Sequence, residues 1–289
     1  MINDQGGING RKINFISYDD AYSPPKTVEQ TRKLVESDEV MAIVGNVGTA
    51  SNIAIQKYLN ARKTPQLFLA TGASRWNDPK NFPYTMGIVP SYHTEGSIYA
   101  EHILKNKPGA KIAVLFQNDD FGKDYLKGFL DGLGDKAKTM IVAELSYEVT
   151  DPTIDSQMVS LKSSGADVFL NITTPKFAAQ AIKKAADIGW KPNPHYLNAV
   201  SNSVGSVLVP AGPENGVGIL SASYMKDPTE VAIDAATDTV GTMHHLWLAV
   251  HHMDKDRVVA AISSGFGKTV VFCQTKRTCD RVEHALQDL

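Results

Sequence analysis

The sequence predicts an α/β protein in which two doubly wound lobes of parallel sheet enclose a cleft and a short α/β tail follows. Three observations predict this fold class. Short apolar runs recur along residues 1–228, amphipathic stretches separate them, and a polar Pro/Gly turn at 105–111 divides the alternation into two sets. Such runs are typical of strands buried on both faces. An alternation of strands with helices produces parallel sheets that helices cover.

The first lobe is expected to span residues 1–106. Its predicted helix and strands lie at 27–37, 40–45 and 66–70. The helix places Val28, Leu34 and Val35 on one face at helical spacing. That face should pack against the sheet.

The second lobe is expected to span residues 107–228. Its predicted strands and helices lie at 111–116, 121–134, 140–145, 167–172 and 175–189. Pro175 suits the first turn of the last helix, and Gly189 ends it. Two open parallel sheets leave a cleft at the carboxyl ends of their strands, where ligands bind.

Bulk composition excludes several classes of protein. The 289 residues carry a net charge of −2, so no overall field draws the chain to nucleic acid or to an acidic membrane. The two cysteines, Cys273 and Cys279, form no CxxC pair, so we expect neither a zinc site, a disulfide framework nor a cofactor. The paired histidines of 244–252 lie too far apart along an extended strand to share a metal ion.

Two loops after strands of the first lobe are rich in small polar residues. They read GNVGTASN at 45–52 and ATGAS at 70–74. Their glycines let the backbone approach a ligand closely, and their N–H and hydroxyl groups could bind a carboxylate. Ser and Thr are also common helix N-caps. The residues therefore leave ligand binding and ordinary capping as alternatives.

Three long segments carry a family resemblance. Residues 2–45, 117–133 and 173–190, in that order, resemble type I solute-binding proteins of ABC importers, the branched-chain amino acid group. The resemblance covers residues 1–228. It implies two flavodoxin-like lobes joined by a hinge that close on a small ligand, a transporter permease as partner, a periplasmic location and no enzyme activity. An enzyme on the same fold stays an alternative, although no nucleophile–base pair stands out.

The resemblance also implies which residues bind the ligand. Residues of the two first-lobe loops would bind its carboxylate, an aromatic residue would stack on it, and the second lobe would add hydroxyl contacts. The first-lobe positions are Thr49, Ala50, Ser51, Gly72, Ala73 and Ser74. The aromatic residue is Phe121, and the second-lobe contacts are Thr173, Thr174 and Ser201. Trp76 and Tyr92 could line the same pocket, but packing is the alternative that we favour for these single aromatics.

One departure from the family bears on the ligand. Amino-acid binders of this family carry an acidic residue in the loop after the strand resembling HYLNAV, whereas this chain has Val200 and Ser201. A buried ammonium without a counter-charge is costly. We therefore expect a small carboxylate, aromatic or branched, and keep an amino-acid-like ligand as the alternative.

The start of the chain also departs from the family. In the family a strand and a helix precede the segment that MINDQGG matches, so the first lobe should lack both and have an exposed sheet edge. We expect weaker binding than in a full-length relative, or none. The opening residues also lack the apolar core of an export signal, so the chain as written would stay in the cytoplasm.

Residues 229–289 suggest a second origin. The stretch 263–277 is not a phosphate-binding loop, because the pattern requires a glycine where Ile262 stands and Lys268 leads into a strand. The tail resembles the start of the second RecA-like domain of DEAD-box RNA helicases. That resemblance implies weak RNA contact by Gln274, Thr275, Lys276 and Arg277. It implies no ATP hydrolysis, since the ATP-binding motifs are absent.

The two resemblances meet near residue 228. Either the chain is a genuine fusion, or its coding sequence was misassembled, and we favour the second. The alternative to a solute-binding protein is therefore a chimeric or fragmentary chain with no activity of its own.

Overall fold

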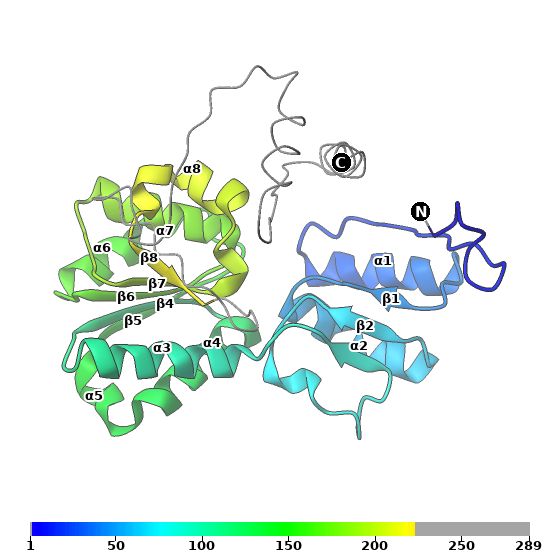
Figure 1. Cartoon of the computed structure of the whole chain (residues 1–289), viewed down its shortest axis with the longest axis horizontal. Coiled ribbons are helices and arrows are strands. Elements are labelled where there is room, and N and C mark those ends of the chain that lie inside the picture. Colours follow the sequence, from blue (N-terminus) through cyan, green and yellow to red (C-terminus); the bar gives the residue numbers. More distant parts are fainter. Residues whose placement is uncertain (1, 223–289) are drawn as a thin grey trace, which may run out of the picture. The chain divides into compact units, whose positions relative to one another are not determined.

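The computed structural model describes residues 2–222, which lie within one compact unit, Met1–Thr229 (Figure 1). The predicted α/β fold class is confirmed. The described strands are all parallel and form one sheet in the order β1-β2-β3 and another in the order β5-β4-β6-β7-β8. The predicted helicase-like segment, 229–289, lies outside the described residues.

The first sheet is short. Its strands are β1 (Ile43–Val44), β2 (Gln66–Leu69) and β3 (Thr85–Gly87). Helices α1 (Pro24–Glu36) and α2 (Thr49–Arg62) pack against each other and cover one face. The predicted face of α1 is confirmed, because Val28, Leu34 and Val35 pack on the buried cluster of Ile43, Ile55 and Leu59.

The other face of the first sheet carries exposed apolar side chains. Val44, Leu67 and Met86 are neighbours in the strand register. Val44 is 52% exposed and Met86 43%. Residues 12–20 form no strand, and Phe15 among them is 77% exposed. This apolar row is what we expect of a sheet that lacks a covering layer.

The second sheet is larger and better buried. Its strands are β4 (Ile112–Gln117), β5 (Ile141–Tyr147), β6 (Val168–Ile172), β7 (His195–Leu197) and β8 (Ile219–Ser221). Every residue of β4 and β6 is buried, as their apolar runs predicted. The run at 140–145 was expected to be buried on both faces, but β5 is an edge strand and several of its side chains are exposed.

Helices cover both faces of the second sheet. Helices α3 (Tyr92–Asn106) and α4 (Asp120–Leu133) contribute to one core cluster, and α6 (Asp155–Ser163) and α7 (Pro175–Asp187) to another. Short helices α5 (Ala137–Met140) and α8 (Val209–Ala211) complete the described set. The predicted start of α7 at Pro175 is confirmed, and Gly189 follows its end with a φ of 66°.

Helix α3 precedes the predicted lobe boundary at residue 106 yet packs closely on α4. Glycines permit this contact. A Cβ on Gly96 would lie 2.3 Å from the Tyr125 carbonyl oxygen, and one on Gly128 would lie 2.0 Å from the His93 carbonyl oxygen. Since a real Cβ does not approach so closely, glycine is required where the two backbones meet. The boundary between 106 and 107 stays a prediction.

Candidate functional site

The two polar loops of the first sheet meet through their threonines. Thr49 Oγ1 lies 2.6 Å from Thr71 Oγ1, and the two side chains are 1% and 0% exposed. Thr49 begins α2, and Gly48 before it has a φ of 93°. The two loops therefore place hydroxyl groups together at the carboxyl ends of β1 and β2.

Ser51 and Ala50, which follow Thr49 in the predicted set, lie outside the contact between Thr49 and Thr71. The Ser51 hydroxyl accepts a hydrogen bond of 2.9 Å from Thr27 of α1 and is 2% exposed. It thus joins α2 to α1, and the structure does not bring it to Thr71. Ala50 is half-buried. Asn52, which the sequence analysis did not single out, holds the loop by donating to the carbonyl oxygens of Asn46 and Gly48.

The second loop is held against the start of α3. The Tyr92 N–H donates to the Gly72 carbonyl at 2.9 Å. A Cβ on Gly72 would lie 2.0 Å from the Pro90 carbonyl oxygen, so this position requires glycine. Ala73 is 5% exposed and belongs to the core cluster beside the second sheet.

The aromatic residues near this loop form a packed group. Tyr92 stacks on Tyr125 with ring centroids 4.5 Å apart, and Phe121 meets both rings edge-on. Phe121 is 3% exposed, so its ring offers little surface to a ligand in this structure. The Trp76 indole donates to Thr71 Oγ1 at 3.3 Å and is 8% exposed. Trp76 and Tyr92 therefore take the packing role that we favoured.

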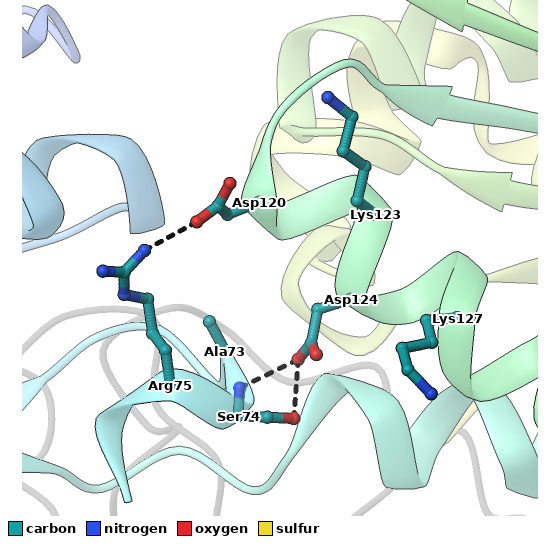
Figure 2. Close-up of a pocket in the computed structure, with 7 residues that line it drawn as sticks. All are labelled: Ala73, Ser74, Arg75, Asp120, Lys123, Asp124 and Lys127. Atoms are coloured by element: carbon teal, nitrogen blue, oxygen red, sulfur yellow. Dashed lines mark hydrogen bonds and ion pairs between the residues drawn. The ribbon is translucent and has the colours of Figure 1, made fainter. Parts of the chain in front are cut away.

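Ser74 ends the predicted first-lobe set and is exposed. Its N–H and its hydroxyl both donate to Asp124 Oδ2, at 2.9 and 3.0 Å (Figure 2). The next residue, Arg75, pairs with Asp120 at 2.7 Å. A pocket of about 230 Å³ surrounds these contacts. Its lining consists of Ala73, Ser74, Arg75, Asp120, Lys123, Asp124 and Lys127.

The predicted hydroxyls of the second sheet bond to their own chain. Thr173 Oγ1 donates to Asn171 Oδ1 at 2.6 Å, and Ser201 Oγ donates to the Thr173 carbonyl at 2.6 Å. Both residues are fully buried. Thr174 is half-buried, and its N–H donates to the Tyr147 hydroxyl at 2.9 Å. The structure thus brings Thr173 and Ser201 together, with their hydroxyl protons already bonded.

Sequence reasoning missed Tyr22. Its ring lies against Gly48, where an added Cβ would be 2.6 Å from Tyr22 Cε2. Burial, and then the charge of Asp119, raise the pKa of the Tyr22 hydroxyl to about 12, while a hydrogen bond with Gln117 lowers it. Tyr22 and Ala21 have φ values of 56° and 50°.

A signal for this turn was present in the sequence. Asp19 and Asp20 accept hydrogen bonds from the N–H groups of Ala21 and Tyr22, which is the Asx-turn geometry that aspartates favour.

Asp119 is the N-cap of α4 and accepts from the N–H groups two and three residues further on. Burial raises the pKa of the Asp119 carboxyl, and its hydrogen bonds oppose that shift.

Residues 2–222 contain neither a metal-binding cluster nor a helix that could span a membrane. No group of three His, Cys, Asp or Glu side chains there could hold a metal ion. No helix within the described part is long and apolar enough to cross a membrane. The predicted RNA-contacting residues, Gln274 to Arg277, fall outside the described residues.

The chain resembles curated solute-binding proteins. It is 23% identical over 245 residues to Leu/Ile/Val-binding protein homolog 7 of Brucella suis biovar 1 (strain 1330), a match covering 81% of this chain and 59% of that relative. It is 22% identical over 234 residues to the leucine-specific-binding protein of Salmonella typhimurium, covering 80% and 62%. The chain thus spans about three fifths of these relatives' length.

Solved structures share the fold. A substrate-binding periplasmic protein from Ralstonia solanacearum superposes with a TM-score of 0.68 at 24% identity, covering 75% of this chain and 60% of that one. The branched-chain amino acid transporter substrate binding protein LivJ from Streptococcus pneumoniae, in complex with isoleucine, gives 0.67 at 21% identity, covering 80% and 65%.

The family model described as periplasmic binding protein matches residues 1–244. The match therefore passes residue 228, where the sequence analysis placed a junction. The resemblance of the tail to a helicase domain stays a prediction. Because the match covers most of the 289 residues, the chain belongs to the periplasmic binding protein family.

Proposed function

We propose that this chain is the solute-binding component of an ABC-type importer and that it binds a small carboxylate at loops 45–52 and 70–74. Its family and the names of its relatives support the transport role. The partner would be a transporter permease, and the place of action the periplasm. Binding would close the protein on the ligand without any bond chemistry.

One observation carries the choice of a carboxylate. The backbone N–H and the hydroxyl of Ser74 converge on a single carboxylate oxygen, that of Asp124. Hydrogen bonds to an ionised acceptor are about twice as strong as neutral ones. The nearby Thr49–Thr71 hydroxyl pair and the first turn of α2 add polar groups at the ends of β1 and β2. Loop 70–74 already binds the chemical group that we assign to the ligand.

The second sheet supplies the reason to prefer a ligand without an ammonium group. At the loop after β7, Ser201 is fully buried and bonds to the Thr173 carbonyl. No acidic side chain stands at Val200 or Ser201 to pair with an ammonium. The relatives named for leucine, isoleucine and valine nevertheless make branched-chain amino acids the alternative ligands.

Matched ligand pairs test the proposal. Isothermal titration calorimetry of the full chain would compare L-leucine with 4-methylpentanoate, which has the same skeleton without the ammonium. We expect heat of binding with 4-methylpentanoate and a weaker response with L-leucine. A folded chain that binds neither, and that also gives no heat with isoleucine, valine or phenylacetate, would overturn the proposal.

Variants locate the binding site. Thr49→Ala and Ser74→Ala should each weaken the binding of 4-methylpentanoate, because each removes a hydroxyl at the two loops. Ser160→Ala is the matched control, since Ser160 is exposed on α6 and away from these loops. Equal affinities for all three variants would place the site elsewhere.

A further inference from the structure

The contact between Ser74 and Asp124 joins residues 50 positions apart in the chain. One oxygen, Asp124 Oδ2, accepts both donors of Ser74 (Figure 2). Ser74 lies at the start of a single helical turn, Ser74–Trp76, after β2, and Asp124 lies in the second turn of α4. The chain therefore supplies its own carboxylate to the donors that we assign to a ligand.

A second carboxylate of α4 strengthens the contact. Asp120 lies four residues before Asp124, so the two share one face of the helix. Asp120 pairs with Arg75 at 2.7 Å. Two successive residues of the loop, Ser74 and Arg75, are thus each bonded to one carboxylate of α4.

Basic and acidic side chains both line the pocket at Ser74. Arg75 pairs with Asp120 and Lys127 with Asp131, and Lys123 adds a third basic side chain to the lining. The pocket has a volume of about 230 Å³. A small carboxylate fits this space once the Asp124 side chain turns away. Because Asp124 is half-buried, its carboxylate can return to water.

We infer that Asp124 is a built-in competitor for the carboxylate donors of Ser74, and that a ligand must displace it to bind. The inference rests on the proposed function in that the ligand is a carboxylate at loop 70–74. An intramolecular competitor lowers the apparent affinity by the fraction of molecules that it leaves open. If Asp124 occupies Ser74 in about nine molecules of ten, its removal should tighten binding about 10-fold.

The first arm of the test needs no natural ligand. The amide resonance of Ser74 would be followed by NMR in the ¹⁵N-labelled full chain, in Asp124→Ala, and during titration with sodium acetate. Asp124→Ala should shift this resonance, and acetate should move it back, whereas sodium chloride should not. In the unsubstituted chain the same acetate concentrations should have little effect, because Asp124 fills the site.

Asp187→Ala is the matched control. It removes an exposed carboxylate from the last residue of helix α7, which is not part of the pocket lining. It should leave the Ser74 resonance and its acetate response unchanged. Alanine favours the helix at both positions. Asp124→Asn, which keeps the shape and removes the charge, provides a second variant and should give a smaller shift in the same direction.

The second arm titrates 4-methylpentanoate into the unsubstituted chain and into Asp124→Ala. We expect a dissociation constant about 10-fold lower in the variant. Equal or weaker binding by Asp124→Ala would overturn the inference. So would a Ser74 resonance that shifts neither on the substitution of Asp124 nor on the addition of acetate. If acetate restores the Ser74 resonance but no larger carboxylate binds either protein, the Asp124 contact stands and the proposed function fails.

Discussion

The polar loops of the two sheets use their hydrogen-bonding groups differently. In the first sheet, Ser74 is exposed and its two donors bind a carboxylate from another element. In the second sheet, Thr173 and Ser201 are fully buried and bond to their own loops. Ser74 is therefore suited to exchanging partners, whereas Thr173 and Ser201 hold a framework in place.

The two sheets also differ in how fully their strands are buried. Among residues 2–222, the first sheet has three short strands and an apolar row open to solvent, whereas the second has five strands, of which β4 and β6 are fully buried. Sites of ligand exchange are drawn from the less stable parts of proteins. The comparison predicts that substitutions in the second region change stability and that those at loop 70–74 change binding.

The largest effect is expected where α3 crosses α4. Gly128→Ala should lower the free energy of unfolding by about 3 kcal/mol, because its Cβ would lie 2.0 Å from the His93 carbonyl oxygen. Gly205→Ala is the control, since a Cβ at Gly205 meets nothing within 4 Å. Urea unfolding of both variants measures the difference. Equal stabilities would show that the two helices do not approach so closely.

A smaller effect on stability is expected in acid. Burial lowers the pKa of His195 to about 3, so the folded chain holds this histidine neutral where the unfolded chain, with a pKa of about 6.5, binds a proton. The free energy of unfolding should therefore fall as the pH drops from about 6.5 toward 3, because the unfolded chain gains a proton that the folded chain does not.

The variant His195→Gln isolates that contribution. Urea unfolding between pH 6 and pH 4 should show a shallower loss of stability for the variant than for the unsubstituted chain. Parallel pH profiles would mean that His195 is not the group responsible.

Substitutions in the loops of the two sheets should have different effects on binding and on stability. Ser74→Ala should weaken carboxylate binding by less than about 30-fold, the loss for about 2 kcal/mol, because it removes one hydrogen bond from the ionised ligand and one from the competing Asp124. Ser201→Ala should leave the affinity unchanged and lower the free energy of unfolding by about 1 kcal/mol, since its buried hydroxyl donates to the Thr173 carbonyl. Calorimetric titration and urea unfolding of both variants would separate the two roles. A loss of affinity in Ser201→Ala would contradict a purely structural role for Ser201.

The smallest effect concerns the turn before Tyr22. Ala21 has a φ of 50°, a region that alanine disfavours by roughly 1 kcal/mol. Ala21→Gly should therefore be neutral or stabilise the chain by about 0.5 kcal/mol. Ala137→Gly, in helix α5, should destabilise by about 1 kcal/mol. Thermal unfolding compares them, and an equal loss in both would argue against strain at Ala21.

Periodicity accounts for what the sequence could predict. The buried strands β4 and β6 are continuous apolar runs, and α7 begins at Pro175 as expected, whereas α1 begins at Pro24, three residues before the predicted helix at 27–37. These features depend on residues close together in the chain. The alternation of such elements is enough to predict the fold class.

Long-range contacts explain what the sequence could not predict. The packing of α3 on α4 depends on Gly96 and Gly128, which carry no local signal of their partners. The edge position of β5 follows from the strand order and not from its apolar run. At the site, the small polar residues predicted loops 45–52 and 70–74. Asp124 could not be connected to Ser74, because their contact exists only in the folded chain.

An NMR titration of the ¹⁵N-labelled full chain with 4-methylpentanoate tests the central claim most directly, because it compares the two sets of loops in one experiment. The account predicts that the largest amide shifts occur at residues 45–52 and 70–76, with Ser74 and Asp124 shifting together as one contact replaces another. Shifts confined to residues 171–174 and 198–201, with Ser74 unmoved at saturation, would contradict it.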